Sequence, residues 1–375
     1  MRKVQVVLDG RALSGVALVV SLDRLATTWQ PDRRYLILAS DDSAKAIVDK
    51  MRSAGAQNIA WVCSDELIDG DVVSPLASRD VAIVLFRPSD MHHSLLLTNR
   101  CNSYCLMCSQ PPTANADDWL IQEAIDVIRH IEASPSVLGL SGGEPLLLGR
   151  ALRVVIDAVA EYHPDTRIEV LTNARLFSNA ELAEHLLSEI SPSVTWLVPL
   201  YGHADYLHDF VVQAPGAFDQ TIAGILNLRE WEQTVQLRIV LIEPVLKVLP
   251  ELAAFIGRNV PFVREVAMMA CEPIGFALAN SAHCSVDLVE WELVLGSAAA
   301  VLRRHRVPFL FMNTPLCALP PSLRSYAHRS ISDWKNVFAE ECSACVVKDD
   351  CSGLFAWHER GWKPTNIKAL QEILS

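Results

Sequence analysis

The sequence predicts an α/β protein whose central region is a parallel sheet flanked by helices. Two observations indicate this fold class. Between residues 92 and 304, apolar runs of strand length alternate with amphipathic stretches of helix length. Such alternation is typical of β–α–β units, whose right-handed crossovers wind in one sense. With 51% hydrophobic residues, the 375-residue chain can also bury a large core.

Six consecutive β–α units can be delimited in this region. The first helix shows the pattern clearly, because Ile121, Ala124, Ile125, Ile128 and Ile131 share one face. Six units are fewer than the eight of a closed barrel, so an open (β/α)6 partial TIM barrel is expected. The strands are predicted near residues 93–98, 137–141, 168–172, 194–200, 235–242 and 263–269. The helices are predicted near residues 118–132, 150–161, 179–190, 217–232, 248–256 and 286–304.

The chain length and the changes of pattern predict three domains. Residues 1–88 are expected to form a small N-terminal α/β domain, and residues 89–306 the partial barrel. Residues 307–375 are expected to form a cysteine-rich extension, because prolines break the regular pattern there. In the N-terminal domain, short strands are predicted at 4–8, 35–39, 58–62, 71–73 and 81–87, and a helix at 44–53 capped by Asp41, Asp42 or Ser43.

Charge and composition exclude several classes of protein. The net charge is −12 and no cluster of Lys and Arg occurs, so nucleic-acid binding is not expected. No apolar run reaches the length of a membrane span, and the first residues do not lead into a signal-peptide core. We therefore expect a cytoplasmic protein. In that compartment ten cysteines argue against a disulfide scaffold and favour metal or cluster ligation.

Three of these cysteines, Cys101, Cys105 and Cys108, have C-x3-C-x2-C spacing directly after the first predicted barrel strand. The pair Pro111-Pro112 follows and cannot continue a helix, so the cysteines are expected on a loop. Such a loop can turn three thiolates toward one point, which suits an iron–sulfur cluster. A 4Fe–4S cube with three protein ligands leaves one iron open to another ligand. Structural zinc is the alternative, but it requires a fourth nearby ligand.

This spacing resembles the signature of the radical S-adenosylmethionine (SAM) superfamily. In that family the cysteines lie on the loop after the first strand of a partial barrel, and the open iron chelates SAM. Met107 stands where the family usually has an aromatic residue. The resemblance extends to the end of the second strand, where Gly142-Gly143-Glu144-Pro145 matches the family's GGE motif. It implies that Gly142, Gly143 and Glu144 bind the amino group of SAM. Without the cysteines, this tetrapeptide would be an ordinary turn.

The resemblance suggests two further SAM contacts. Asn173 follows the third strand, where relatives have T-N-G near the ribose, but Ala174 replaces the glycine. Capping of a helix or turn is an equally good interpretation of Asn173. Arg238 in the fifth strand could meet the SAM carboxylate, or it could be an edge arginine. Pro199 replaces the serine that relatives place on SAM. No catalytic acid or base can be assigned, although Asp209, Cys271 and Glu272 lie in suitable regions.

A second cysteine group lies in the C-terminal extension. Cys342, Cys345 and Cys351 have C-x2-C-x5-C spacing, and Cys317 precedes them. Four thiolates complete a site for zinc or for a 4Fe–4S cluster, and ligand type alone does not decide between these. The spacing is similar to the SPASM or shorter twitch domain of radical SAM enzymes. SPASM domains usually have seven cysteines for two clusters. This group has four, so the resemblance implies one auxiliary cluster here.

The loop from Leu95 to Pro112 is similar to that of the radical SAM maturase of the His-Xaa-Ser peptide system. This resemblance implies an enzyme that reductively cleaves SAM to a 5′-deoxyadenosyl radical and takes a hydrogen atom from a ribosomally made precursor peptide (a RiPP), leading to oxidation or cross-linking. It also implies a second radical SAM enzyme as partner and an electron donor such as flavodoxin or ferredoxin. Two alternatives stay open. One is a radical SAM enzyme acting on a small molecule, like the molybdenum-cofactor cyclase, which shares GGEP but has three C-terminal cysteines. The other is a non-enzymatic iron–sulfur or zinc scaffold.

Overall fold

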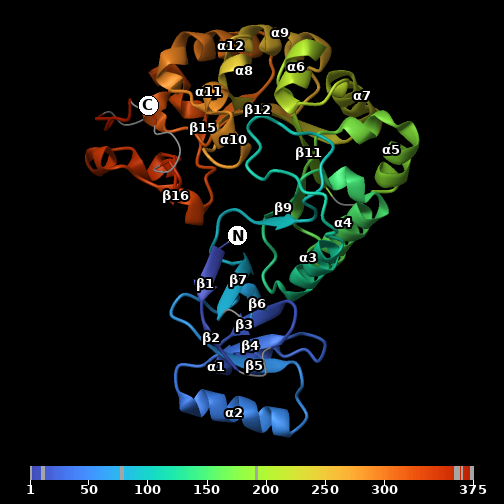
Figure 1. Ribbon diagram of the computed structural model, residues 1–375, viewed down its shortest axis with the longest axis vertical. Coiled ribbons are helices and arrows are strands. Elements are labelled where there is room, and N and C mark those ends of the chain that lie inside the picture. The colour runs from blue at the N-terminus through green and yellow to red at the C-terminus, as the bar shows by residue number, and fades with distance from the viewer. Residues whose placement is uncertain are drawn as a thin grey trace. The chain divides into compact units, whose positions relative to one another are not determined.

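The computed structural model describes residues 2–9, 13–76, 80–190, 193–358, 364 and 366–371 (Figure 1). The chain divides into two compact units that interleave along the sequence. One comprises Met1–Leu97, Asp117–Gly139 and Arg153–Ile168, and the other comprises Thr98–Ala116, Leu140–Leu152 and Glu169–Ser375. The domain limits at residues 88 and 306 stay predictions. Over the described ranges, no helix combines the length and the apolar character that crossing a bilayer requires.

The N-terminal sheet of the first unit closes on itself. Its strand order is β1-β7-β6-β3-β4-β5-β2. The two outermost strands, β1 and β2, are separated in the sequence by Val6 alone, so one continuous segment pairs antiparallel with β7 and with β5. The sheet is therefore a small barrel with no free edge between these strands. Its strands are β1 (Arg2–Gln5), β2 (Val7–Leu8), β3 (Ala17–Val20), β4 (Tyr35–Leu38), β5 (Ile59–Cys63), β6 (Val72–Leu76) and β7 (Val81–Phe86).

Three helices accompany this small barrel. Helix α2 (Asp42–Ser53) packs on β4 and β5 and is capped by Asp41, whose carboxylate accepts hydrogen bonds from the Ser43 and Ala44 amides (Figure 1). Helix α1 (Leu22–Thr28) follows β3; sequence analysis missed both elements. Helix α3 (Trp119–His130) packs on β3 and β6, and Arg34 pairs with Asp126 of α3 at 3.2 Å. Residues 1–88 therefore cover one face of α3 as well as their own core.

The predicted parallel α/β sheet is confirmed. Eight strands have the order β15-β14-β13-β12-β11-β10-β9-β8. The pairs from β11 to β15 are all parallel, which is consistent with a partial barrel. The first six strands are β8 (Ser94–Leu96), β9 (Val137–Ser141), β10 (Arg167–Leu171), β11 (Val194–Pro199), β12 (Thr234–Leu241) and β13 (Glu265–Ala270), close to their predicted positions.

The sheet continues into the region that sequence analysis assigned to the extension. Strand β14 (Phe309–Met312) pairs parallel with β13, and β15 (Ala327–His328) pairs parallel with β14. Phe309 and Phe311 alternate with more exposed neighbours, which is the period of a strand with one buried face. The remaining strands, β16 (Asn336–Val337) and β17 (Leu354–Phe355), form an antiparallel pair.

Helices α5, α7, α9 and α12 lie outside strands β11 and β12 (Figure 1). They connect successive parallel strands, as right-handed β–α–β units require. Helix α4 (Arg150–Tyr162) precedes them and leads into β10. The helices of the second unit are α5 (Ala180–Leu187), α6 (Asp205–Val212), α7 (Ala217–Glu230), α8 (Glu243–Leu246), α9 (Leu249–Asn259), α10 (Phe276–Ala279), α11 (Ser281–Cys284) and α12 (Glu292–Arg304).

Candidate iron–sulfur and SAM site

The structure places Cys101, Cys105 and Cys108 on the loop that follows β8, as predicted. The end of helix α6 holds the middle of this loop. The amides of Tyr104 and Leu106 donate to the carbonyls of Val212 and Val211, both at 2.9 Å. A turn from the Cys108 amide to the Cys105 carbonyl, at 3.0 Å, brings the last two cysteines onto one side. The loop is therefore fixed by backbone bonds, and within it the Cys108 thiol donates to the Gln110 carbonyl at 3.0 Å.

The three thiols are partly exposed, and the pKa of each lies above its ordinary value. Burial, together with negative charge on Cys108 and Cys101, raises the pKa of Cys105 to about 12. Burial, with charge on Glu144 and Cys108, raises the pKa of Cys101 to about 11, and burial raises that of Cys108. Such thiols resist deprotonation without a cation, whereas a bound metal or cluster stabilises them as thiolates.

Glycine is required at Gly142 and Gly143 because the cluster loop passes directly over them. A Cβ on Gly142 would lie 2.5 Å from the Thr98 carbonyl oxygen, and one on Gly143 would lie 2.2 Å from the Arg100 oxygen. The same close approach lets the Gly143 amide donate to Thr98 and the Glu144 amide donate to Arg100, each at 2.8 Å. The GGE motif thus supports the start of the cysteine loop through its backbone.

Glu144 links the ends of β9 and β10. Its side chain is fully buried. Oε1 accepts from the Leu146 amide at 2.9 Å and from Thr172 Oγ1 at 2.6 Å, and Oε2 accepts from the Asn173 amide at 2.7 Å. Burial raises the pKa of Glu144 and these hydrogen bonds oppose that rise. Because all three neighbours are donors, the carboxylate is the form that fits. Its predicted contact with SAM stays a prediction.

Asn173 and Arg175 reach from the end of β10 to the cysteine loop. Asn173 Nδ2 donates to Asn102 Oδ1 at 2.6 Å. Arg175 Nη1 donates to the Asn102 carbonyl and, at 3.0 Å, to Ser103 Oγ. The Arg175 guanidinium also lowers the pKa of Cys105. Sequence analysis missed Arg175, although its position two residues after Asn173 was the available signal.

Arg238 lies on β12 in a largely apolar setting. Its Nε donates to Gln236 Oε1 at 2.6 Å, and its Nη1 approaches Met269 Sδ at 3.6 Å. Burial lowers the pKa of Arg238, with opposing contributions from Glu169, Glu265 and Tyr201. Tyr201 was not assigned to the site from the sequence. Burial raises its pKa well above the usual range, and charge on Cys105, Cys108 and Cys271 adds to that rise. Tyr201 therefore connects the surroundings of Arg238 with those of the cysteine loop.

The remaining acidic candidates have structural partners. Asp209 accepts from the Gly216 and Phe218 amides at 2.6 and 2.8 Å, which caps helix α7. Glu272 Oε1, at the end of β13, accepts from Trp357 Nε1 at 2.9 Å and from Lys335 Nζ at 3.2 Å. These contacts account for both carboxylates without a catalytic role.

The segment after β13 backs the cysteine loop. A Cβ on Gly275, which has φ +62°, would lie 2.5 Å from the Cys108 oxygen. The Phe276 amide donates to the Cys108 carbonyl at 2.9 Å, and Asn280 Nδ2 donates to the Leu106 carbonyl at 3.0 Å. Cys284, which is fully buried, forms a thiol–thiol contact with Cys271. The last strand end of the predicted barrel thus helps to hold the cluster loop.

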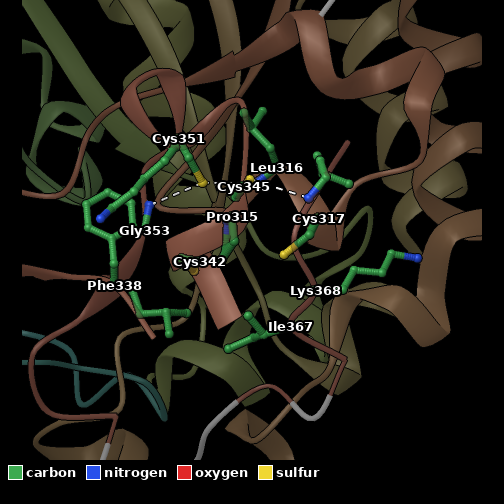
Figure 2. A pocket seen from close by; sticks show the side chains of 13 residues that line it. Pro315, Leu316, Cys317, Phe338, Cys342, Cys345, Cys351, Gly353, Ile367 and Lys368 are labelled. Carbon is green, nitrogen blue, oxygen red and sulfur yellow. Dashed lines mark hydrogen bonds between the residues drawn. The ribbon is translucent and has the colours of Figure 1, made fainter. Parts of the chain in front are cut away.

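The four C-terminal cysteines line one cavity, as Figure 2 shows. Cys317 and Cys351 lie in an apolar cluster with Leu316, Val347 and Leu370. The Leu316 and Gly353 amides each donate to Cys351 Sγ at 3.4 Å, and the Leu370 amide donates to Cys345 Sγ at 3.4 Å. Amide donors directed at sulfur in an apolar surround are typical of thiolates that bind a cluster or a metal.

Within the described ranges, no three His, Cys, Asp or Glu side chains are grouped so that they could hold one metal ion. By ligand type, four thiolates suit zinc or a 4Fe–4S cluster equally, so the auxiliary cluster stays a prediction.

Residues 95–246 match the model of the Radical SAM superfamily. No protein with curated annotation matches the chain. Among solved structures, the chain is similar to Streptococcus suis SuiB bound to S-adenosylmethionine, with 14% identity, a TM-score of 0.46 and coverage of 61% of this chain and 51% of SuiB. It is also similar to native anSMEcpe with bound AdoMet and Cp18Cys peptide, with 14% identity, a TM-score of 0.44 and coverage of 58% and 62%. A third similar structure is a radical SAM methyltransferase from Sphaerobacter thermophilus, with 15% identity, a TM-score of 0.43 and coverage of 64% and 72%. The chain spans about half the length of SuiB.

Proposed function

We propose, on the premise that residues 95–246 are a radical SAM domain, that this protein is an enzyme that reductively cleaves SAM. The observation that carries this proposal is the cysteine loop after β8. Its three partly exposed thiols all have raised pKa values, and the backbone of Gly142 and Gly143 supports the start of the loop. Three protein ligands leave one iron of a 4Fe–4S cube for SAM. When bound, that cluster supplies the electron that cleaves SAM to methionine and a 5′-deoxyadenosyl radical.

The chain's own residues hold and orient the reactants. Gly142 and Gly143 allow the cysteine loop to approach the end of β9, and Glu144 ties that end to β10. Arg175 places positive charge beside the loop. We assign the amino group of SAM to the GGE segment, its ribose region to Asn173 and its carboxylate to Arg238. Among the described residues, the guanidinium of Arg238 is hydrogen-bonded to Gln236 and Met269 and to no carboxylate, and the charges of Glu169 and Glu265 act on it from farther away. Its planar donors suit a carboxylate.

The C-terminal cysteines are proposed to hold one auxiliary 4Fe–4S cluster, as in a SPASM or twitch domain. Supporting this, all four line one cavity and amides donate to their sulfurs. The auxiliary cluster would accept the electron left after substrate oxidation, or it would serve as a structural centre. Zinc at this site is the alternative, because four thiolates also complete a structural zinc site.

For the substrate we propose a ribosomally made precursor peptide, modified by oxidation or cross-linking in the cytoplasm. The similarity of the Leu95–Pro112 loop to the maturase of the His-Xaa-Ser system supports this choice. A second radical SAM enzyme and a flavodoxin or ferredoxin are the proposed partners. A small-molecule substrate is the second candidate, because the SAM site makes no distinction between the two.

An anaerobic iron and sulfide count tests the proposal. The wild-type protein is compared with a Cys101/Cys105/Cys108→Ala variant, with SAM and reductant added and 5′-deoxyadenosine measured. Two 4Fe–4S clusters predict roughly eight irons in wild type and about four in the variant, with nucleoside formed only by wild type. If neither protein cleaves SAM, the proposed enzymatic function is refuted and an iron–sulfur or zinc scaffold becomes the proposed function. SAM binding at equilibrium separates these outcomes further, because a scaffold has no SAM site.

The small N-terminal barrel is proposed to bind the precursor peptide. Removal of residues 1–88 would not test this cleanly, because it also uncovers α3 and breaks the pair between Arg34 and Asp126. A charge reversal at Lys3, which is exposed on β1, changes the surface and keeps the core. A peptide affinity unchanged by such surface substitutions all around the barrel would exclude this role.

A further inference from the structure

The segment Asn366–Gln371 reaches the C-terminal cysteine cavity from far along the sequence. Asn366 anchors its start, because its amide and Nδ2 both donate to Asp287 Oδ2, at 3.2 and 3.0 Å. The other end is fixed by the Val346 amide, which donates to the Leu370 carbonyl at 3.1 Å. The side chain of Leu370 is buried in the apolar cluster around the cysteines. The segment is therefore held at both ends.

One backbone amide of this segment points at sulfur. The Leu370 amide donates to Cys345 Sγ at 3.4 Å. Figure 2 shows Ile367 and Lys368 among the residues that line the cavity with the four cysteines. The amides of Leu316 and Gly353 both donate to Cys351 and lie within two residues of a cysteine in the sequence. Segment 366–371 thus supplies a donor to Cys345 from 25 residues away.

Hydrogen bonds to ligand sulfurs are one of the properties that set the reduction potential of an iron–sulfur cluster. A reduced cluster carries one more negative charge than an oxidised one, and part of that charge lies on the sulfurs. An N–H donor therefore stabilises the reduced form more than the oxidised form. Loss of the donor lowers the potential, with no change of ligands.

We propose that segment Asn366–Gln371 tunes the auxiliary cluster, the Leu370 amide raising its reduction potential so that it accepts electrons more readily. The inference rests on the proposed auxiliary cluster and deepens it, because it favours electron acceptance over a purely structural role. Leu370 is a positioning residue that acts through Cys345.

Proline substitution removes a single amide donor, because proline has no N–H. The full chain with Cys101, Cys105 and Cys108 replaced by alanine isolates the signal of the C-terminal cluster. In this background we compare Leu370→Pro with two matched controls, Lys368→Pro and Ala369→Pro, each of which adds the same ring and leaves the Leu370 amide in place. Redox titration followed by electron paramagnetic resonance measures the ratio of reduced to oxidised cluster at each potential. For Leu370→Pro we expect about a tenfold fall in that ratio, which is about 59 mV for a one-electron couple. For Lys368→Pro and Ala369→Pro we expect none.

Each outcome supports or overturns the proposed tuning of the auxiliary cluster. Equal potentials in the parent, Leu370→Pro and both controls overturn the inference and leave the cluster in place. A parent protein without iron at the C-terminal cysteines overturns both the inference and the auxiliary cluster. If Leu370→Pro does not take up iron at the C-terminal cysteines, hydrogen exchange of the parent protein is measured in place of the redox titration. Slower exchange of the peptide that contains 366–371 in the loaded than in the iron-free protein supports the inference, and unchanged exchange refutes it.

Discussion

Glu144→Gln separates a structural role of this residue from a role in binding SAM. The structure shows a buried carboxylate that accepts hydrogen bonds from two amides and one hydroxyl, at 2.6–2.9 Å. Glutamine keeps the size but offers one acceptor oxygen and an NH2 group. If its oxygen faces Leu146 and Thr172, its NH2 group faces the Asn173 amide, so donor meets donor. The substitution should therefore weaken the link between β9 and β10 even without SAM.

The magnitude follows from the three bonds. One charge-assisted bond is lost, which costs about 1.5–3 kcal/mol, and two others weaken to neutral bonds, which costs about 0.5–1 kcal/mol each. A neutral side chain is cheaper to bury than a carboxylate, and this offsets part of the loss. We expect a net fall of about 2–3 kcal/mol in the free energy of unfolding. The Asn173 amide should then exchange about 30-fold faster or more, if its opening follows the same free energy.

The assay is urea unfolding of the iron-free protein together with hydrogen exchange of the peptide that contains Asn173. Glu184→Gln, on the exposed face of α5, is the matched control and should change the free energy of unfolding by less than about 0.5 kcal/mol. SAM affinity is measured on the cluster-loaded protein. If Glu144→Gln unfolds like the control and only SAM affinity falls, Glu144 is a ligand of SAM and not a link between strands.

Three further substitutions test other contacts of the site. Gly143→Ala places a Cβ 2.2 Å from the Arg100 oxygen, so it should lower the free energy of unfolding by about 3 kcal/mol and remove most of the iron from the first cluster. The control Gly296→Ala, with nothing within 4 Å of its Cβ, should stabilise helix α12 by about 1 kcal/mol. Equal thermal unfolding of both variants would contradict the close approach at Gly143. Burial lowers the pKa of His208 to about 4, below the ordinary 6.5. Between these two pH values His208 is protonated in the unfolded chain but not in the folded one. The free energy of unfolding should therefore fall by about 3 kcal/mol as the pH falls from about 6.5 to 4. The non-titrating His208→Gln variant should show a smaller loss over that range in urea unfolding at each pH, and identical pH profiles would exclude the burial argument. Arg175→Lys keeps the charge but loses the guanidinium geometry that contacts Asn102 and Ser103. It should lower the free energy of unfolding by about 1–2 kcal/mol and slow cluster loading in an iron-uptake time course. Loading at the wild-type rate would show that the cysteine loop does not depend on these contacts of Arg175.

The sequence by itself determined the arrangement of elements around the first cysteine group. A three-cysteine spacing after an apolar strand needs only local contacts to place thiols on a loop at the end of that strand. Periodicity likewise identified the six β–α units, because burial of one helix face or one strand imposes a pattern within a few residues. The glycine pair at 142–143 could also be recognised from the sequence. The reason why glycine is needed there, the close approach of the Thr98 and Arg100 carbonyls, could not.

Only the tertiary structure decided contacts between segments that are far apart in the chain. The closure of the N-terminal barrel depends on β1 and β2 pairing with different strands, which no local pattern records. The extension of the sheet by β14 depends on pairing with β13, and four residues are too few for a distinctive period. Glu144 became a link because Thr172 and Asn173 fold against it. The Leu370 amide reaches Cys345 across 25 residues. A backbone donor has no side-chain signature, so its partner is set by the path of the folded chain.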